Sequence, residues 1–367
     1  MKFVHISDLH IGKRLLERSF LEDQEYILRK IVNIVADEKP DAVLIAGDIY
    51  DKTIPSAESV EIFDDFLTRL SDVCKNVFAI SGNHDSAERI AFGSGLFKKG
   101  VYMSPVYRGN IEPITLADKI GDVDIWLLPF IKPSTVRSYH DVDINDYTTA
   151  VKTVIEKLKI DKNKRNVLVA HQFVTGAEKS GSEEISIGGL DNVDAKVFKN
   201  FDYVALGHIH KKQTIDKKIR YSGTPLKYSF SELKNKNSVT IVELNDELSL
   251  KEIELEPKRE LKEIKGAFDN VIKQKASDDY YHIVLTDEND IVDGANKLRA
   301  VFPNLLKLDY ENTRTATKSN LSNIDDLQDK STLELFDDFF ELQNGKKLDS
   351  KEKKYMSKVI ENVMEEE

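Results

Sequence analysis

The sequence predicts a layered α/β fold for about its first two thirds, then a small α+β unit and a helical tail. Up to about residue 245, short β-forming runs recur, and helical periods lie between the first of them. Strand, helix, strand, helix is typical of a largely parallel core sheet covered by helices. After residue 245 this alternation gives way to charged segments. We therefore expect three parts: a layered α/β domain at 1–245, a small α+β capping domain at 246–311, and a linker with helices at 312–367.

The first part contains short runs of β-forming residues that suit buried strands. They are Phe3–Ile6, Ala42–Ala46, Val77–Ile80, Ile125–Leu128, Val167–Ala170, Tyr203–Leu206 and Val239–Leu244. Two intervening segments have apolar residues at helical spacing. Their predicted buried faces are Ile27, Ile31, Ile34 and Val35 in one segment and Val60, Phe63, Leu67 and Leu70 in the other.

The remaining third predicts a smaller unit and a tail. Tyr280–Leu285 and Leu305–Leu308 are predicted strands around a helix at Val292–Val301, while Glu252 to Lys265 could be strand or linker. Asn312 to Asn323 has the composition of a flexible linker. Beyond it, two helices are expected, and the first carries a stripe formed by Phe336, Phe339 and Phe340. Because the stripe has few local apolar partners, docking on another protein is favoured over an intramolecular core.

The composition restricts the location and the partners. Lys and Arg supply 53 positive charges against 64 from Asp and Glu, for a net charge of −11. Such a chain cannot bind nucleic acid through overall charge, so any attraction must be local or come from metal ions or a partner. Cys74 is the single cysteine, which fits a reducing compartment. We expect a cytoplasmic protein without an export signal or a membrane span, because no apolar run approaches the ~18 residues that a span needs.

Polar residues with metal-binding potential follow five of the predicted strands. They are Asp8 and His10, then Asp48 and Asp51, then Asn83, His84 and Asp85, then His171, then His208 and His210. Five of the chain's 8 histidines belong to this set. Sites in open α/β sheets form beyond the carboxyl ends of the strands, so these side chains should meet in one crevice.

These donor types indicate a two-metal centre. Carboxylate, imidazole and amide ligands suit Mn²⁺, Fe²⁺ or Zn²⁺ better than Ca²⁺ or Mg²⁺. Seven ligands are enough for two ions if one carboxylate bridges them, and such a pair, about 3.5–4 Å apart, can clamp a phosphoryl group. The neighbouring Gly47, Gly82 and Gly207 allow the backbone to approach closely. A single Asp-x-His or Gly-Asp would be ordinary turn chemistry; the recurrence on successive strands favours metal binding.

The complete set of motifs resembles a known superfamily. Asp8-x-His10, Gly47-Asp48-x-x-Asp51, Gly82-Asn83-His84-Asp85, His171 and Gly207-His208-x-His210 are similar to the motifs of calcineurin-like metallophosphoesterases. Val169–Val174, Ala205–His210 and Tyr221–Leu226 further resemble bacterial SbcD nuclease subunits. The resemblance covers residues 1 to about 240. Thr224 stands where that family usually has serine, and the hydroxyl is kept.

The resemblance implies a role for each site residue. One metal would be held by Asp8, His10, Asp48 and His210, and the second by Asp48, Asn83, His171 and His208, with Asp48 bridging. The family's preferred ion is Mn²⁺. His84 would face the substrate, stabilise the scissile phosphate and protonate the leaving oxygen. Asp51 is the expected partner that orients His84, and Asp85 is the alternative for that role.

The same resemblance implies an activity and partners. SbcD-type subunits act with SbcC, a long coiled-coil ATPase, and pair as two-fold dimers of nuclease subunits. The expected activity is Mn²⁺-dependent degradation of double-stranded DNA ends from 3′ to 5′, with endonucleolytic cutting of single strands or hairpins, in DNA repair and recombination. One alternative is a phosphoesterase for small molecules or phosphoproteins. Another is a non-catalytic scaffold, although such proteins usually lose ligands and none is missing here.

Other polar residues are expected to be structural or peripheral. His5 should be a core or sheet-face histidine, because its side chain alternates away from Ile6. His140 is expected in an exposed loop, and His282 in a short strand without a partner cluster. Arg14, Arg18 and Arg89 follow two of the motifs, so phosphate contacts are a weaker expectation for them.

Overall fold

Two six-stranded sheets lie face to face at the centre of the protein, in a computed structural model that describes residues 1–94, 100–180, 182, 191–275, 277–312, 331–344 and 346–366. The first sheet has the order β16 (Leu248–Glu254), β15 (Ser238–Leu244), β1 (Lys2–Ile6), β4 (Ala42–Ala46), β5 (Val77–Ile80) and β6 (Val101–Met103). The second has the order β13 (Gln213–Asp216), β14 (Ile219–Tyr221), β12 (Tyr203–Gly207), β9 (Arg165–His171), β8 (Asp122–Leu128) and β7 (Ile114–Ala117).

The centre of each sheet is parallel and its margins are antiparallel. Strands β1, β4, β5 and β6 run parallel, and so do β8, β9, β12 and β14. Strands β15, β16, β13 and β7 pair antiparallel with their neighbours. The predicted single core sheet is thus two sheets, each with the predicted parallel centre.

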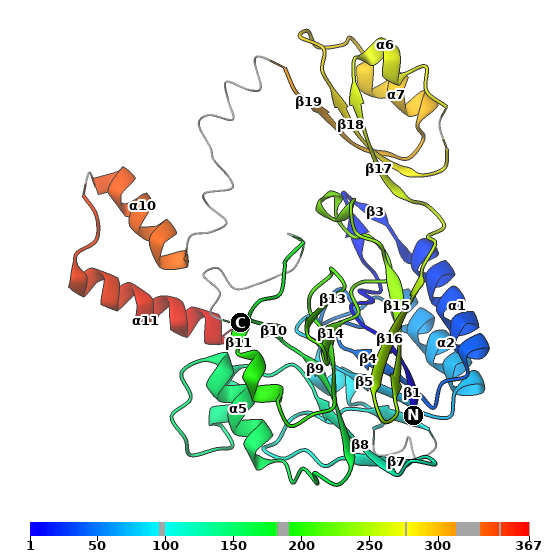
Figure 1. Ribbon diagram of the computed structural model, residues 1–367. Helices are drawn as coiled ribbons and strands as arrows, with labels where there is room; N and C mark the ends of the chain where they lie inside the picture. The colour runs from blue at the N-terminus through cyan, green and yellow to red at the C-terminus, as the bar shows by residue number, and fades with distance from the viewer. Residues whose placement is uncertain are drawn as a thin grey trace.

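Helices cover the outer faces, which gives four layers (Figure 1). Helices α1 (Leu21–Glu38) and α2 (Ala57–Val73) pack on the first sheet, and α5 (Tyr147–Lys157) packs on the second. The alternation of side chains in each strand explains the layering: Phe3 of β1 and Val167 of β9 point between the sheets, whereas Val4 points toward the helices. Short elements complete this body: β2 (Arg14–Leu15), β3 (Arg18–Ser19), α3 (Ala87–Ile90), α4 (Pro133–Arg137), β10 (Phe173–Val174), β11 (Asn192–Val193), η1 (Ala195–Phe198) and η2 (Phe230–Glu232).

The face that α2 buries differs from the prediction. Helix α2 begins after Ser56, whose hydroxyl accepts a hydrogen bond from the Ser59 amide at 3.3 Å. Phe63, Phe66 and Leu70 are buried, whereas Val60 is 45% exposed. Phe63 and Leu70 were predicted on the buried face; the prediction for Val60 was wrong, because the apolar stripe is centred closer to Phe66.

A small unit, the cap, stands at one end of the body (Figure 1). It contains a parallel sheet of β17 (Leu261–Gly266), β18 (Tyr280–Leu285) and β19 (Leu305–Tyr310), with α6 (Phe268–Val271) and α7 (Gly294–Val301) packed on one face. The expected boundary at residue 245 falls in the turn between β15 and β16, and β16 completes the first sheet of the body. Arg259 joins cap and body through ion pairs with Glu22 and Asp23 at 2.8 and 2.9 Å.

The tail forms two helices, α10 (Thr332–Asn344) and α11 (Ser350–Glu366). Asp337 of α10 accepts a hydrogen bond from the Leu348 amide and pairs with Lys353 of α11, both at 2.7 Å. Most of the expected linker, from residue 313 onward, lies outside the described residues. Among the residues that the structure describes, no helix combines the length and apolar composition of a membrane span.

Three histidines outside the motifs have defined partners. His5 is fully buried between the sheets and contacts the Tyr203 hydroxyl at 2.8 Å, as expected for a core histidine. His140 is half-buried and contacts the Tyr107 hydroxyl at 2.7 Å, so it is not fully exposed. The expectation that His282 lacks a partner cluster is wrong, because its ring lies between Glu263 at 3.1 Å and Asp309 at 2.7 Å.

Candidate metal centre

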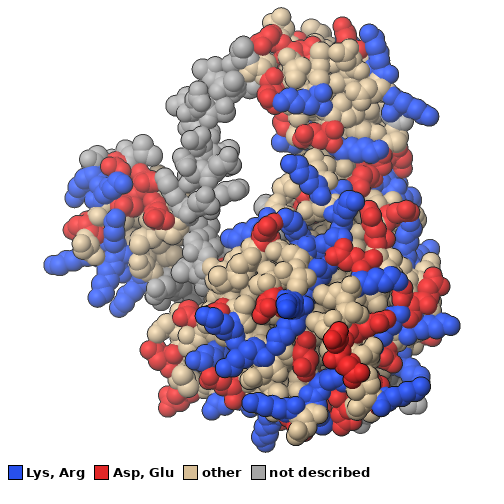
Figure 2. Space-filling model, in the orientation of Figure 1, with Lys and Arg blue, Asp and Glu red and all other residues tan. Residues whose placement is uncertain are grey.

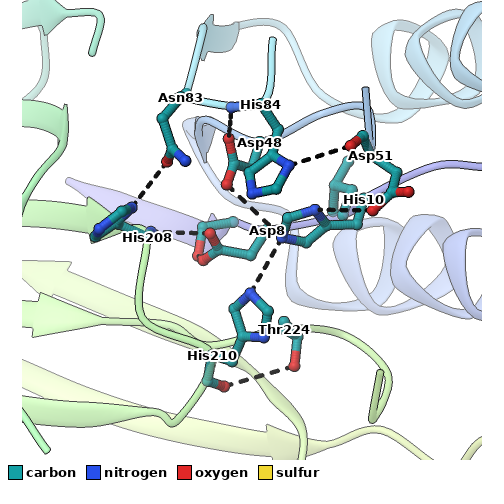
Figure 3. Close-up of polar contacts among 12 residues, drawn as sticks. Asp8, His10, Asp48, Asp51, Asn83, His84, His208, His210 and Thr224 are labelled. Carbon is teal, nitrogen blue, oxygen red and sulfur yellow. Dashed lines mark hydrogen bonds and ion pairs between the residues drawn. The ribbon is translucent and has the colours of Figure 1, made fainter. Parts of the chain in front are cut away.

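The ends of five strands deliver the predicted residues to one place. Asp8 and His10 follow β1, Asp48 follows β4, and Asn83 and His84 follow β5 of the first sheet; His171 ends β9, and His208 and His210 follow β12 of the second sheet. Figure 3 shows the side chains from the two sheets turned toward a common centre. The structure therefore brings together all seven predicted ligands and His84.

Backbone hydrogen bonds join the loops that carry these residues. The Asp8 amide donates to the Gly47 carbonyl and the His10 amide to the Asp48 carbonyl, both at 3.0 Å. Side chains connect the loops further: Asp8 Oδ1 accepts from the His208 amide at 2.8 Å, and Asp48 Oδ1 accepts from the His84 amide at 2.9 Å. Each carboxylate thus has Oδ1 held by a neighbouring loop. Asp8 Oδ2 also accepts from the Ser7 hydroxyl, whereas Asp48 Oδ2 faces His10 and His171.

Several of these residues adopt backbone conformations that L side chains seldom use. Asp8, His10, Asp48 and His208 have φ values of 53°, 45°, 49° and 96°. Strained residues of this kind persist only where the surrounding structure over-determines them, and they concentrate at functional sites.

The expected glycines are needed for close packing rather than only for turns. A Cβ added to Gly82 would lie 2.1 Å from Asp48 Oδ1. At Gly207 it would lie 2.0 Å from the Ala46 carbonyl oxygen and 2.7 Å from His171 Nδ1. Neither position has room for any other residue.

The donor atoms form overlapping groups. In three sets, ligand atoms lie within 4.8 Å of one another: Asp8, His10 and His210; His10, Asp48 and His84; and Asp8, Asp48 and His171. Asp48 Oδ2 lies 3.7 Å from His10 Nε2 and 3.3 Å from His171 Nε2, which places this oxygen between the two predicted metal positions. Asn83 Oδ1 contacts His171 Nε2 at 2.9 Å and His208 Nδ1 at 2.8 Å. Buried oxygen and nitrogen donors in this arrangement fit two divalent ions of the Mn²⁺, Fe²⁺ and Zn²⁺ type.

Burial and the close charges shift the pKa values of the cluster. Burial raises the pKa of Asp8 to about 6 and lowers the pKa of His208 to about 3. Burial also opposes charge on His171 and Asp48, but their mutual attraction prevails: the pKa of His171 rises to about 9 and that of Asp48 falls well below its ordinary value. A bound divalent cation would favour the deprotonated form of every ligand, as metal ions do.

The orienting contact of His84 comes from a different group of Asp51 than predicted. His84 Nδ1 lies 3.1 Å from the Asp51 backbone carbonyl, whereas the Asp51 carboxylate pairs with Lys13 at 2.8 Å and lies 3.8 Å from His10 Nδ1. Figure 3 shows dashed lines from both the His84 and the His10 rings to Asp51. Asp51 thus lies beside His84 and contacts it through its main chain, while its carboxylate faces His10 and Lys13; its role in orienting His84 stays a prediction.

Asp85, the alternative partner of His84, has a structural role. Its buried carboxylate accepts hydrogen bonds from the amides of Ile49, Tyr50 and Gly82 at 2.9 to 3.0 Å. It therefore holds together the loops that follow β4 and β5, and it does not contact His84 through any described hydrogen bond.

Two side chains near the site were not predicted. Glu232, in η2, contacts His210, and Phe130 stacks on His208 with ring centroids 6.3 Å apart and planes 21° from parallel. Neither lies in a motif: Glu232 is brought to the site only by the tertiary fold, whereas Phe130 follows the end of β8 by two residues. Of the three arginines expected near phosphate, Arg18 contacts Asn304 of the cap at 3.3 Å, and Arg14 donates to the Glu17 carbonyl.

Comparisons with known proteins agree with this geometry. The model of the family described as calcineurin-like phosphoesterase matches residues 1–212, and that described as the type 5 capsule protein repressor C-terminal domain matches residues 257–344. The SbcD subunit of the nuclease SbcCD from Staphylococcus epidermidis is 36% identical over 84% of this chain and 85% of its own. The protein of the same name from Staphylococcus saprophyticus is 32% identical over 100% of this chain and 99% of its own. Among solved structures, a dimetal phosphatase from Danio rerio is 14% identical over 70% of this chain and 96% of its own, with a TM-score of 0.41. The chain therefore belongs to the calcineurin-like phosphoesterases and, within them, to the SbcD nuclease subunits, which makes it a metal-dependent phosphodiesterase.

Proposed function

We propose that this chain is the Mn²⁺-dependent DNA nuclease subunit of a complex with an SbcC-type ATPase. The observation that carries the proposal is the convergence of seven buried or half-buried ligands beside a half-buried His84. The family to which the chain belongs supports the nuclease activity, and the names of its relatives support a two-subunit complex.

Each ligand is assigned to one of two ions. Asp8, His10, Asp48 and His210 would hold the first, and Asp48, Asn83, His171 and His208 would hold the second, with Asp48 common to both sets. Bound together, two such ions supply an activated water and a clamp for the phosphoryl oxygens. The ligand set does not by itself distinguish Mn²⁺ from Fe²⁺ or Zn²⁺, so the choice of Mn²⁺ rests on the family.

His84 is the proposed proton donor. The Asp51 carbonyl accepts from Nδ1 at 3.1 Å, which fixes a proton on that atom and leaves Nε2 for the substrate. In its charged form the ring can give the Nε2 proton to the leaving oxygen and stabilise the negative phosphate. Because most of the ligands behind it are buried, we place the substrate on the side of the cluster where His84 and Asn83 are partly exposed.

A lysine-lined groove next to His210 suits a nucleic-acid backbone. Its volume is about 230 Å³, and Lys211, Lys212, Lys234 and Lys236 contribute to its walls. Lys234 and Lys236 form no ion pair with any residue that the structure describes. In the view of Figure 2, acidic and basic side chains are interspersed over the surface. This local basic groove is the kind of attraction that a chain with a net charge of −11 requires.

The tail is the proposed docking element for the ATPase. Phe339 of α10 is 57% exposed and Tyr355 of α11 is 69% exposed, and these large side chains suit a helical partner surface. A homodimer of nuclease subunits within a heterotetramer is proposed on family grounds, and so are the 3′–5′ polarity, the hairpin cleavage and a cytoplasmic location.

An assay of the full chain on three substrates tests this proposal. With Mn²⁺, we expect cleavage of end-labelled duplex DNA and of a DNA hairpin, stimulated by the ATPase partner and abolished by a chelator. A chromogenic phosphodiester serves as the third substrate and reports the metal centre alone. Hydrolysis of only the small substrate, with and without the ATPase, would overturn the nuclease proposal in favour of a small-molecule phosphoesterase.

A further inference from the structure

Glu232 is a buried carboxylate with a place beside the candidate metal centre. It is fully buried at the end of η2. Its Oε1 lies 2.8 Å from His210 Nδ1 and also accepts from the Ser182 hydroxyl, while Oε2 accepts from the Tyr228 amide at 2.8 Å. Both oxygens are therefore engaged, and the carboxylate cannot turn away from His210 without breaking another hydrogen bond.

This contact determines which nitrogen of His210 can bind a metal. A carboxylate accepts, so His210 Nδ1 carries a proton and Nε2 presents its lone pair. His210 Nε2 lies 3.1 Å from His10 Nε2, on the side of the proposed first ion (Figure 3). His171 is oriented differently, through the Ala46 main-chain carbonyl at 2.8 Å. Asp48 Oδ2 lies 3.3 Å from His171 Nε2, but Asp48 is itself an assigned ligand, whereas Glu232 belongs to neither ligand set and contacts His210 through Nδ1.

The turn that carries Glu232 also contacts the cap. Phe230, two residues earlier, packs on His282 of β18 with ring centroids 5.1 Å apart. It also packs against the core of the body between the first sheet and its helices. A single short turn thus contacts the cap on one side and a metal ligand on the other.

We propose that Glu232 is a positioning residue for His210, and that the Phe230–Glu232 turn makes this positioning depend on where the cap sits. The inference rests on the assignment of His210 to the first ion in the proposed function. A displacement of β18 would move Phe230, and the turn would pass that movement to the carboxylate that orients His210. The affinity for the first ion would then respond to the cap.

Mn²⁺ titration of the full chain, followed by electron paramagnetic resonance and calorimetry, tests the role of Glu232. We expect Glu232→Gln to weaken the first site by about 10- to 100-fold, which is the usual cost of losing a partner behind a metal ligand. Glu232→Asp should recover part of the affinity. Glu256→Gln is the matched control, because it removes the same charge from a side chain that is 86% exposed and should change nothing.

His210→Ala separates the two ways in which the test can fail. If His210→Ala leaves both Mn²⁺ affinities unchanged, the metal assignment itself is wrong. If His210→Ala weakens the site and Glu232→Gln, still folded by circular dichroism, does not, Glu232 is not a positioning residue. Either result is independent of nuclease activity.

A double-mutant cycle tests the dependence on the cap. Phe230→Ala should weaken Mn²⁺ binding several-fold in the otherwise native chain and have a much smaller effect when Glu232 is already Gln. Phe230→Leu, which keeps an apolar contact, should behave nearly as the native chain. Equal effects of Phe230→Ala in both backgrounds, or none in either, would refute the coupling and leave the role of Glu232 to the preceding experiment.

Discussion

The candidate metal centre has a buried wall and an accessible edge, and the two sides differ in how they are built. The wall contains Asp8, His10, Asp48, His171, His208 and His210, none of them more than 5% exposed. The edge contains Asn83 and His84, which are partly exposed. Wall residues are held by several neighbours in the core, whereas His84 has solvent on one side. We therefore infer that the wall, together with the edge ligand Asn83, sets metal affinity and stability, and that His84 at the edge sets turnover.

The largest expected effect is a loss of cleavage activity, caused by a substitution at the edge. His84→Ala should reduce phosphodiester cleavage by about 10²- to 10⁴-fold, because a positioned proton donor contributes about that much. Mn²⁺ occupancy should remain close to native, since His84 is not one of the seven assigned ligands. Cleavage of the chromogenic phosphodiester and Mn²⁺ titration measure the two quantities.

His140→Ala is the matched control for that change. His140 is also a half-buried histidine, and its ring contacts Tyr107 rather than the cluster. It should leave cleavage unchanged. A His84→Ala variant that cleaves at the native rate, or one that loses its metals, would remove the distinction between edge and wall.

A substitution in the wall should instead lower stability and metal affinity. Gly207→Ala places a Cβ 2.0 Å from the Ala46 carbonyl and 2.7 Å from His171 Nδ1, so the contact that orients His171 must break. We expect a loss of stability of about 1–3 kcal/mol or more, as for other forced overpacking, together with weaker binding of the second ion. Urea unfolding with a chelator present and Mn²⁺ titration test this.

A second glycine provides the comparison for Gly207→Ala. At Gly266, in β17 of the cap, an added Cβ meets its nearest neighbour, Val271 Cγ2, at an ordinary 3.6 Å. Gly266→Ala should therefore change neither stability nor metal affinity appreciably. If the two alanine variants unfold at the same urea concentration, the packing argument for the wall fails.

The sequence predicts the members of this site far better than the way in which they are held. Strand ends carry Asp8, His171 and the other ligands, and the edge where parallel strands end is common to all of them, so spacing along the chain is sufficient. Glu232 lies 22 positions from His210, in a turn without a motif, and only the fold brings the two together. Side chains alternate between the two faces of a strand whether the strands form one sheet or two. The sequence pattern therefore did not predict the second sheet.

His5, which is buried behind the wall, should make folding stability depend on pH. Burial, with the Arg220 charge adding to it, lowers the pKa of His5 to about 3 in the folded protein. The unfolded chain takes up this proton near pH 6.5, so folding stability is complete above that pH and is lost as the pH falls toward 3. His5 should contribute a loss of about 2 kcal/mol between pH 7 and pH 5.

Urea unfolding of the native chain and of His5→Gln, with a chelator present, measures this contribution. Groups common to both chains cancel in the comparison. The variant will be less stable at pH 7, because its contacts with Tyr203 and Leu206 change, but its stability should decline less steeply toward pH 5. Parallel curves for the two chains would show that His5 takes up its proton in the folded state as well.

The smallest effect is expected on DNA binding, from substitutions in the lysine-lined groove. Lys234→Gln with Lys236→Gln should weaken DNA binding about uniformly across sequences and lower the salt dependence, because each lost phosphate contact removes about 0.9 from the slope of log affinity against log salt. Metal affinity and hydrolysis of the small phosphodiester should not change. The pair Lys159→Gln and Lys162→Gln alters the charge equally at exposed positions beyond α5 and should keep the native slope. A slope that falls equally in both pairs would mean that DNA senses only the overall charge of the chain, and the groove would then have no part in carrying a strand toward His84.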